Sequence, residues 1–436
     1  MPFLFTPLAP LEAARIFIEK FDKPACLLVA VSGGSDSTGL LLALHETVQT
    51  SGRDITLHAI TIDHALRAES AEEASAVTGL CARFGIPHHI RRWDGEKPTT
   101  GVSAAARLAR YSLIGDVAAE IGADAVILGH THGDQQETIA MRGSRSVRSD
   151  NLGLAGMADA VLYRSHHWVL RPFLCVTRED IRAYLEARNE GWIDDPSNDD
   201  AKYERVRTRQ KLEAEPYERE ATDARAALSR RVAEWIGVHA SAYSQLLIRL
   251  DPAGLAEDAA VLRYALSALA SVLGGRSFGL SSQSMDRVMT FLVSGALGRM
   301  TASRVVFDRR SGGLYLYREN RNIEVLTLSA GDSGIWDGRF AVKNDLSRDV
   351  LINGGAKGEG GPAFPATLPR GVVSRLLQSA PSIEDDGCRC CALSTDGISV
   401  RALLAPYDLF LPRFDLELAN RIAALLERAP YPQPPV

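Results

Sequence analysis

Hydrophobic and polar positions follow two different periods along the first half of the chain. Short apolar runs of strand length are separated by segments in which apolar residues recur at helical spacing. The strand-like runs are residues 26–31, 55–63, 86–93 and 124–130. The helix-like segments are residues 37–47, 68–84 and 102–121. Strands that alternate with helices predict an α/β fold on a parallel sheet, in which ligands bind beyond the carboxyl ends of the strands.

This regular alternation ends after the fourth strand. A polar, arginine-rich stretch at residues 141–157 is typical of a loop. Residues 168–174 then form a packed segment, and residues 177–189 are expected to be helical. Residues 202–273 are strongly helical and carry no strand signal. We therefore place a domain boundary near Leu212.

The last third of the chain changes pattern again. A helix is expected around residues 283–293, followed by a hairpin over residues 304–319 that turns at Ser311-Gly312-Gly313. Residues 353–364 are rich in glycine and are expected to form a loop. The expected domains are residues 1–212 (α/β), 213–325 (mainly helical) and 326–436 (a small α+β region).

Composition fits a globular protein. The chain has 436 residues, of which 46% are hydrophobic and 24% charged, so about two to three domains are expected. Its formal net charge of -5 means that a nucleic-acid site would have to be a local basic patch. Residues 1–21 are expected to form a first helix rather than a signal peptide, and no run is apolar enough to span a membrane. We expect a cytoplasmic protein.

Six cysteines are too few for a disulfide framework in a chain of this length. Three of them lie in apolar segments, where a buried thiol is the simpler interpretation: Cys26, Cys81 and Cys175. Cys388, Cys390 and Cys391 are clustered, but three thiols without a nearby histidine do not complete a common zinc site. The sequence leaves open whether this trio binds a metal.

The first predicted strand runs into a Ser-Gly-Gly-Ser-Asp-Ser loop and then into a helix. Such a turn presents unpaired backbone N–H groups, its glycines let an anion approach, and the helix N-terminus adds about half a positive charge. The loop can therefore bind phosphate without a lysine. The alternative is an ordinary glycine-rich turn in which Asp36 or Ser37 caps the helix. The candidate phosphate-binding residues are Ser32, Gly33, Gly34, Ser35, Asp36 and Ser37.

The hexapeptide matches the SGGxDS loop of the N-type ATP pyrophosphatases, PP-loop enzymes that cleave ATP between the α- and β-phosphates and adenylate a substrate. Further blocks resemble one branch of that superfamily, the tRNA(Ile)-lysidine synthetases. In chain order these blocks are residues 62–74, 105–114, 129–138, 171–174, 194–209 and 335–340. The resemblance is collinear through about residue 210 and patchy afterwards, and the order of the blocks makes it specific.

This resemblance implies a nucleotide-binding domain of the adenine nucleotide alpha hydrolase type at residues 1–212, followed by a helical tRNA-binding domain and a small tRNA-contacting region. Family members are ligases that use ATP to adenylate the wobble cytidine of the minor isoleucine tRNA with a CAU anticodon. The side-chain amine of free L-lysine then displaces AMP and forms lysidine. The implied ligands are ATP and Mg²⁺, with Asp36 as the candidate metal ligand.

Candidate residues for handling ATP and cytidine follow from the same blocks. Arg107 and Arg110 are three residues apart on a predicted helix, so they share a face beside Tyr111. As surface charges they would be ordinary, but the resemblance assigns them a catalytic role near the α-phosphate. Ile62 and His64, at the end of the second strand, are candidates to line the adenine site, although a lone histidine there is more often structural.

Candidate residues for lysine recognition follow the fourth strand. Asp134 and Glu137 are three residues apart at the start of a helix, where they can bind the ammonium group, and His130 is a candidate proton acceptor. The same spacing fits a capping box, so these acids can be cap, ligand or both. Family members usually carry two adjacent acids in this block, whereas this chain has Gly133 in the first place and Thr131 where a second histidine is common.

Two local basic patches are candidates for binding tRNA phosphates, which would position the anticodon stem while splayed bases carry the sequence. As solvated surface charges alone these runs would be ordinary. The first patch is Arg142, Arg145 and Arg148, and the second is Arg205, Arg207 and Arg209 with Lys202 and Lys211. The sequence does not determine the oligomeric state, and a homodimer is compatible with it.

Three other activities compete with this interpretation. An ATP-dependent tRNA thiolase of the same superfamily would need reactive or cluster-binding cysteines near the nucleotide site, whereas the cysteine trio lies far along the chain. A non-catalytic RNA-binding protein on a decayed scaffold would be consistent with Gly133. A small-molecule amidotransferase-type synthetase is disfavoured because no glutaminase-like nucleophile block is visible.

Overall fold

The structure of the protein is a computed structural model, and it divides into two compact units. The described residues are 7–65, 70–144, 152–194, 219–355, 364–385 and 388–436. The first unit comprises Met1–Arg225 with Pro432–Val436, and the second comprises Ala226–Tyr431. The division into three domains expected above stays a prediction.

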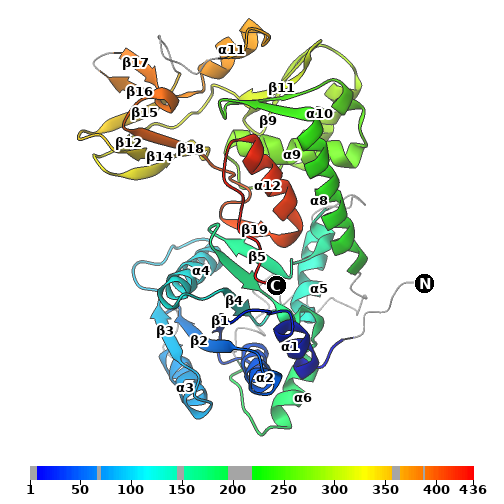
Figure 1. Ribbon diagram of the computed structural model, residues 1–436, viewed down its shortest axis with the longest axis vertical. Coiled ribbons are helices and arrows are strands. Elements are labelled where there is room, and N and C mark those ends of the chain that lie inside the picture. The colour runs from blue at the N-terminus through cyan, green and yellow to red at the C-terminus, as the bar shows by residue number, and fades with distance from the viewer. Residues whose placement is uncertain (1–6, 66–69, 145–151, 195–218, 356–363, 386–387) are drawn as a thin grey trace. The chain divides into compact units, whose positions relative to one another are not determined.

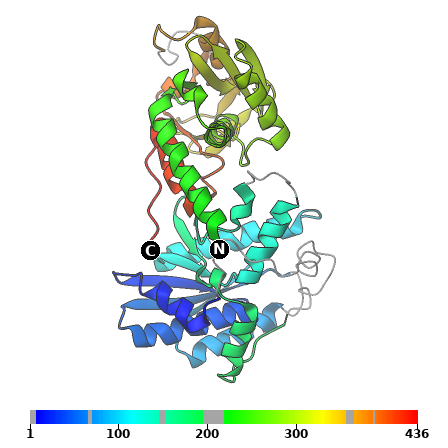
Figure 2. The same ribbon diagram turned by 90° about the vertical axis from the view of Figure 1, so that its right-hand side faces the viewer.

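The first unit is the predicted α/β domain, and Figure 1 shows its sheet in blue and cyan. Its central strands are parallel in the order β6-β4-β1-β2-β3, and β5 pairs antiparallel with β6. Figure 2 shows helices on both faces of this sheet. The strands are β1 (Ala25–Ala30), β2 (Ile55–Asp63), β3 (His88–Arg92), β4 (Ala125–Leu128), β5 (Ala160–Tyr163) and β6 (His167–Leu170). The helices are α1 (Pro10–Ile18), α2 (Ser35–Ser51), α3 (Ser70–Arg83), α4 (Val102–Ile121), α5 (His132–Gly143) and α6 (Arg178–Glu186), with 3₁₀ turns η1 (Leu152–Ala155) and η2 (Pro172–Cys175).

Strand β1 is the centre of this unit's core. Leu27, Leu28 and Val29 have no exposed surface, as a parallel strand covered on both faces requires. β2 lies on one side of β1 and β4 on the other, so the chain leaves β1 at the point where the strand order reverses. Ligands of open α/β sheets bind at this switch point, beyond the strand carboxyl ends. The loop at residues 31–34 therefore lies at the expected ligand edge.

The second unit contains three small antiparallel sheets. Their strand orders are β7-β8-β11-β10-β9, β12-β15-β16-β17 and β13-β14-β18. The strands are β7 (Ala240–Tyr243), β8 (Leu247–Leu250), β9 (Gly298–Ala302), β10 (Val305–Arg310), β11 (Gly313–Arg318), β12 (Leu326–Leu328), β13 (Ser333–Trp336), β14 (Phe340–Asn344), β15 (Val350–Gly354), β16 (Pro381–Asp385), β17 (Cys388–Cys391), β18 (Ile398–Ala402) and β19 (Phe410–Pro412). The helices are α8 (Arg219–His239), which begins in the first unit, α9 (Ala259–Gly274), α10 (Ser282–Val293), α11 (Arg370–Leu377) and α12 (Leu416–Leu425), with 3₁₀ turns η4 (Ala253–Ala256), η5 (Ala392–Ser394) and η6 (Arg413–Asp415).

The expectation of a helical stretch without strands over residues 202–273 is wrong in its described part. β7 and β8 form a hairpin between α8 and α9. Its turn holds Ser244 and Gln245 in the left-handed region, at φ 50° and 59°. Glycine, asparagine or aspartate normally marks such a turn, so the sequence carried no turn signal. The hairpin expected at residues 304–319 is confirmed by the pairing of β10 with β11.

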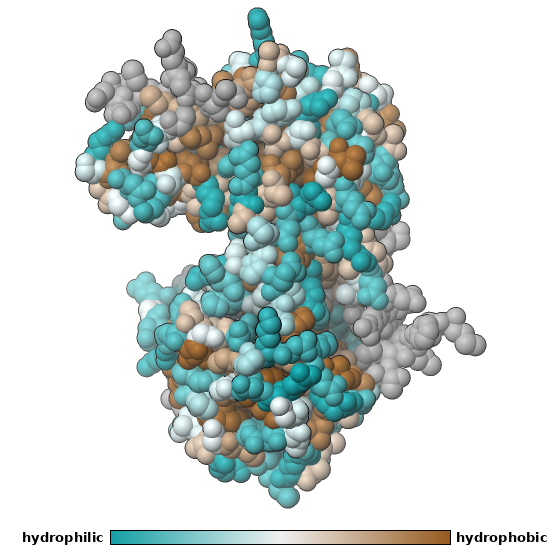
Figure 3. Space-filling model, in the orientation of Figure 1, coloured by the Kyte–Doolittle hydropathy of each residue, from teal (hydrophilic) through white to brown (hydrophobic). Residues whose placement is uncertain are grey.

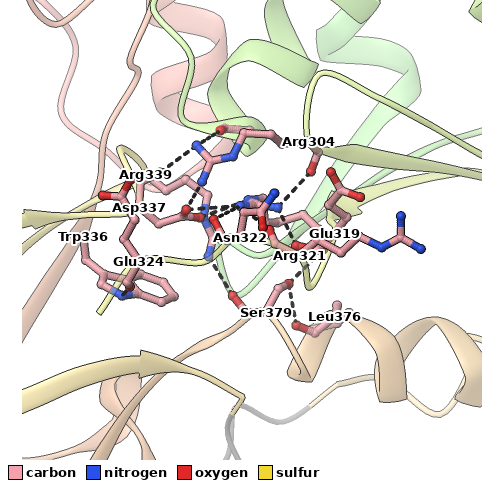
Figure 4. A network of polar contacts seen from close by, with 12 residues as sticks. Arg304, Glu319, Arg321, Asn322, Glu324, Trp336, Asp337, Arg339, Leu376 and Ser379 are labelled. Atoms are coloured by element: carbon pink, nitrogen blue, oxygen red, sulfur yellow. Dashed lines mark hydrogen bonds and ion pairs between the residues drawn. The ribbon is translucent and has the colours of Figure 1, made fainter. Parts of the chain in front are cut away.

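A cluster of buried ion pairs surrounds Asp337 in the turn between β13 and β14 (Figure 4). Its carboxylate accepts hydrogen bonds from the guanidinium groups of Arg304, Arg318 and Arg339. The side chains of Asp337 and Arg318 have no exposed surface. Burial lowers the pKa of Arg339 to about 10, although Asp337 opposes that shift. This cluster connects the β9–β10 turn, β11 and the β13–β14 turn in the second unit.

The helices in the described part of the chain include no candidate membrane span. Within the described ranges, no helix combines the length and apolar character needed to cross a bilayer. Figure 3 shows hydrophilic and hydrophobic residues interspersed over the face in view.

Candidate active site

The loop between β1 and α2 is an open cradle of backbone amides. Gly33 has a φ of 86°, and its carbonyl oxygen accepts a hydrogen bond from the N–H of Ile193 at 2.9 Å. Helix α2 begins at Ser35, and Gly34 is its N-cap. Within the described part of the chain, no N–H group of residues 33–36 donates a hydrogen bond. Unpaired amides at a helix N-terminus bind phosphate groups.

The serines of the loop differ in exposure: some are buried and hydrogen-bond within the loop, and one is accessible to solvent. The Ser37 hydroxyl accepts a hydrogen bond from the Ser32 N–H at 3.1 Å and donates to the Gly34 carbonyl at 3.2 Å. Ser35 and Ser37 are buried, whereas Ser32 is exposed. The alternative of Asp36 or Ser37 as N-cap is wrong, because Gly34 takes that position without a side-chain cap. Ser37 instead holds the loop in shape from inside.

Gly129, directly after β4, brings a second segment against the loop. A Cβ atom at this position would lie 3.0 Å from the Cα of Ser37 and 3.1 Å from the carbonyl oxygen of Asp36. Only glycine allows the end of β4 to approach the first turn of α2 so closely. The chain that follows, from His130 into α5, therefore starts beside the phosphate-binding loop.

Asp36 is held by an arginine from another helix. Arg178, the first residue of α6, donates from Nε to both carboxylate oxygens of Asp36 at 3.1 Å and from Nη2 to Oδ2 at 2.7 Å. Both side chains are partly accessible, with 18% of Asp36 and 30% of Arg178 exposed. Hydrogen bonding to Asp36 raises the pKa of Arg178 despite burial. The Asp36 carboxylate therefore lies at the loop as one half of a two-point ion pair.

The acids of α5 lie in the electrostatic neighbourhood of the same arginine. The charges of Asp134 and Glu137 add to the rise in the pKa of Arg178, after the effects of Asp36 and burial. Glu137 is 2% exposed, and burial lowers the pKa of the neighbouring His132. The guanidinium of Arg178 thus pairs with Asp36 and also feels the charges of Asp134 and Glu137.

The capping box of α5 differs from the one expected. Helix α5 begins at His132, so the box consists of Thr131 and Asp134 rather than Asp134 and Glu137. Oδ2 of Asp134 accepts hydrogen bonds from the Thr131 N–H at 2.9 Å and from its hydroxyl at 3.2 Å. Glu137 lies one turn beyond the box. Asp134 therefore caps α5. Glu137 has no part in this capping box, so capping does not explain why its carboxylate is buried.

Three arginines surround the buried Tyr111 on α4. Arg107 donates to the Tyr111 hydroxyl at 3.3 Å, and the guanidinium carbon of Arg107 lies 4.9 Å from the ring centroid. Burial alone would raise the pKa of Tyr111, but the charges of Arg171, Arg107 and Arg110 outweigh it and lower the pKa. A group of cations this dense suits a phosphate-bearing ligand.

Arg171 also orients His130. Its Nε donates to Nδ1 of His130 at 3.3 Å, and its Nη1 donates to the carbonyl of Ala158 at 2.6 Å. When His130 is neutral, its proton therefore resides on Nε2. The role of His130 as a proton acceptor stays a prediction, and it requires the bond from Arg171 to break.

The candidate adenine residues lie at the end of β2. Ile62 and His64 are half-buried there, and the imidazole of His64 meets the indole of Trp93 edge-on with centroids 6.2 Å apart. Burial, followed by the charge of Arg110, lowers the pKa of His64. Nδ1 of His64 is buried and has no hydrogen-bond partner among the described residues. A neutral imidazole with an unused nitrogen fits contact with a nucleobase.

The basic patches are only partly covered by the structure. Arg142 donates to the carbonyl of Gly156 at 2.6 Å and to that of Gly153 at 3.4 Å, so it fixes the segment after α5. Its role in tRNA binding stays a prediction. The other residues of both patches lie outside the described ranges: Arg145, Arg148, Lys202, Arg205, Arg207, Arg209 and Lys211.

Sequence reasoning missed Arg178 and gave no role to Arg171. Arg171 lies in one of the blocks that carry the resemblance, but its contact with His130 spans 41 positions and could not be read from spacing. Arg178 carried one weak signal, because a cation in the first turn of a helix opposes the helix dipole and needs another explanation.

Comparison with known proteins identifies close relatives of this chain. Residues 11–215 match the PP-loop domain family. The tRNA(Ile)-lysidine synthase of Rhizobium meliloti (strain 1021) is 43% identical over 446 residues, which cover 99% of this chain and 98% of the relative. The enzyme of the same name from Mesorhizobium japonicum is 37% identical over 94% of each chain. The one from Brucella ovis is 34% identical over 92% of this chain and 95% of the relative.

One solved structure gives a weaker similarity. The U34-tRNA thiolase NcsA from Methanococcus maripaludis aligns with 51% of this chain and 73% of its own, at 15% identity and a TM-score of 0.38. A similarity this low does not decide between the two activities.

Proposed function

The chain belongs to the tRNA(Ile)-lysidine synthase family, and from that premise we propose that it is an ATP-dependent ligase that forms lysidine. In the first step the wobble cytidine of the CAU-anticodon isoleucine tRNA attacks the α-phosphate of ATP through its 2-carbonyl oxygen, and pyrophosphate leaves. In the second step the side-chain amine of free L-lysine attacks C2 and AMP leaves. The observation that carries this proposal is the open amide cradle beside the carboxylates of α2 and α5.

The first step is a positioning and electrostatic task. The unpaired amides of residues 33–36 bind the polyphosphate, and Ser32 adds an accessible hydroxyl. Arg107 and Arg110 stabilise the charge that develops at the α-phosphate. His64 and Ile62 line the adenine base.

Magnesium fits the same site through one residue. Mg²⁺ binds nucleotide phosphates with only one or two protein carboxylates, and the partly exposed Asp36 is at the loop. Asp36 would therefore hold the ion, which would neutralise phosphate charge. Among the described residues, no group of three or more histidine, cysteine, aspartate or glutamate side chains could hold a metal ion.

The second step needs an ammonium site and a route for its proton. Glu137 is buried within one helical turn of Asp134, so the two can hold the ammonium of lysine away from bulk water. His130 receives a proton from that ammonium before attack. Gly133 leaves this chain with fewer acids here than is usual in the family, so Asp134 and Glu137 carry the recognition.

Phosphate contacts to the tRNA come from the two basic patches. Arg142 and Arg145 form part of the first, and Arg205, Arg207 and Arg209 form the second. A homodimer stays a prediction, which light scattering on purified protein would test.

The chemistry of the cysteines disfavours the thiolase alternative. Burial raises the pKa of Cys81 to about 11, and burial together with Asp124 raises the pKa of Cys26. Thiols with raised pKa values are poor nucleophiles at neutral pH. The nucleotide loop at residues 31–37 contains no cysteine, so it offers no thiol for sulfur transfer.

A direct test incubates the protein with ATP, labelled lysine and unmodified CAU-anticodon tRNA, followed by nucleoside analysis. We expect labelled lysidine in the tRNA and release of pyrophosphate. ATP consumption with no labelled nucleoside would contradict the proposal. A tRNA with cytidine replaced at the wobble position is the matched control and should stay unlabelled.

A further inference from the structure

We propose that Arg178 supplies the cation that the phosphate-binding loop itself lacks, by binding the pyrophosphate portion of ATP. The loop contains no lysine, and the guanidinium arrives from α6, 142 positions further along the chain. This inference rests on the proposed function only for the identity of the ligand, since the geometry concerns any polyphosphate.

Asp36 engages only one edge of the Arg178 guanidinium. Nε and Nη2 donate to the carboxylate of Asp36, whereas Nη1 makes no hydrogen bond within the described ranges of the chain. A guanidinium carries five N–H groups in a planar fork, so the Nη1–Nη2 end stays available. That end has the geometry for two parallel bonds to a phosphate group. The 30% exposure of the side chain leaves room for a ligand.

The anchor of Arg178 is part of the anion cradle. Asp36 is the second residue of α2, and its own backbone N–H belongs to the unpaired set at the loop. A carboxylate that grips the guanidinium at this position fixes the cation beside those amides. Asp36 is therefore a positioning residue for Arg178, in addition to any contact with Mg²⁺.

A cation here also offsets local negative charge. Asp36, Asp134 and Glu137 all act electrostatically on Arg178. A polyphosphate that approached the loop without this guanidinium would meet three carboxylates. Arg178 also stands at the positive end of α6, an unfavourable position for a cation unless it serves another purpose.

A second ion pair joins α2 to the segment just after α6, and it shows what a purely structural contact looks like. Arg188 donates to both oxygens of Glu46 from Nε and Nη2, at 2.8 to 3.0 Å, and its Nη1 donates to the carbonyl of Tyr184 at 3.2 Å. All three nitrogens of Arg188 are thus engaged, and the pair connects the regions of α2 and α6. Arg188→Met is therefore a matched control for Arg178→Met.

The test is calorimetric titration of the full chain with inorganic pyrophosphate in magnesium-free buffer. We expect Arg178→Met to weaken binding by about tenfold to a hundredfold, as loss of charge-assisted hydrogen bonds does. Arg178→Lys should recover part of the affinity, because a lysine supplies the charge without the fork. Arg188→Met should stay within about twofold of wild type.

Several results would overturn the inference. They are an absence of pyrophosphate binding by the wild type, wild-type affinity in Arg178→Met, or an equal loss in Arg188→Met, which would mean that the ion pair only joins the helices. If Arg178→Met does not fold, Arg178→Lys decides, and wild-type affinity in that variant would overturn the inference. If the wild type binds pyrophosphate but makes no lysidine, the proposed function is wrong, and the titration of the Arg178 variants still decides whether Arg178 binds pyrophosphate. A wild type that makes lysidine while Arg178→Met binds pyrophosphate normally would remove only this inference.

Discussion

Each unit contains an aspartate that is ion-paired with arginine. The two clusters differ in how many of their hydrogen-bond donors and acceptors have a protein partner. Asp337 and Arg318 have no exposed side-chain surface, and all three guanidinium nitrogens of Arg318 donate hydrogen bonds. Asp36 and Arg178 are partly exposed, and Nη1 of Arg178 has no partner among the described residues. The residue types are the same, so composition alone does not distinguish a structural cluster from a ligand site.

The difference follows from what surrounds each carboxylate. Arg318 also donates to the backbone carbonyls of Glu319, Arg321 and Asn322, and Arg339 donates to that of Ser379. Such carbonyls offset the cost of burying charge, and they leave no donor for a ligand. The loop at Asp36 has the opposite character, because the amides of residues 33–36 donate to no described residue. From this unused hydrogen-bonding capacity at an accessible position, we infer that the Asp36–Arg178 cluster is the one that binds a ligand.

The largest expected effect is the loss of the satisfied cluster. Asp337→Ala should lower the free energy of unfolding of the second unit by about 3–5 kcal/mol, because it leaves buried guanidiniums without their carboxylate. Hydrogen exchange across residues 226–431 would measure it. If the free energy of unfolding fell by less than about 1 kcal/mol, the buried Asp337 cluster would not be a structural cluster of the kind described.

Loss of the open cluster should affect chemistry instead of folding. Asp36→Ala should reduce pyrophosphate release by about a hundredfold to a thousandfold, while stability changes by about 1 kcal/mol or less. Pyrophosphate release and chemical denaturation would be measured on the same preparation. Unfolding comparable to that of Asp337→Ala would contradict the distinction.

A matched pair of conservative substitutions sharpens the comparison. Arg318→Lys should cost about 2–3 kcal/mol of stability, because an ammonium cannot reach the carbonyls that the guanidinium serves. Arg178→Lys should cost about 0.5–1 kcal/mol, because one edge of its guanidinium contacts no group in the described part of the protein. If denaturation experiments showed the same loss of stability in both variants, the two arginines would not differ in how many of their donors stabilise the fold.

Glu137 tests whether the acids near Arg178 serve the second step. Glu137→Gln should slow lysine transfer by about tenfold to a hundredfold and leave pyrophosphate release near the wild-type rate. Rapid-quench measurement of both steps would separate them. Equal loss in the two steps would contradict the assignment of Glu137 to lysine.

The smallest expected effect concerns Arg142, whose bonds to Gly156 and Gly153 resemble the satisfied cluster. Arg142→Ala should cost about 1 kcal/mol of stability. If Arg142 also contacts a tRNA phosphate, the salt dependence of tRNA binding should flatten by about one unit of slope. An unchanged slope would leave Arg142 as a structural residue and place tRNA binding elsewhere.

Local patterns were sufficient for most of the first unit. The strand at residues 55–63 and the helix at residues 102–121 have the predicted bounds, since both depend on periodic burial within one segment. The phosphate-binding loop was also local, because its glycines and serines are consecutive in the chain. The β7–β8 hairpin was missed because Ser244 and Gln245 carry no turn signal.

The partners of the site residues were not accessible from sequence. The pair of Asp36 and Arg178 spans 142 positions, and nothing in the spacing of either residue indicates the other. The capping box depends on where α5 begins, which the pattern does not fix to one residue. Sequence therefore supplied the types of residue at the site, and the fold supplied which donors and acceptors remain unused.

The most direct test of the account is calorimetric titration of the wild type and Gly33→Ala with a nonhydrolysable ATP analogue and magnesium. Alanine at this position is strained by the left-handed backbone of the loop and should close the cradle. We predict about one nucleotide bound per chain in the wild type, with binding weakened by about tenfold or more in the variant. A wild type that takes up no nucleotide, or a variant that binds as tightly as the wild type, would contradict it.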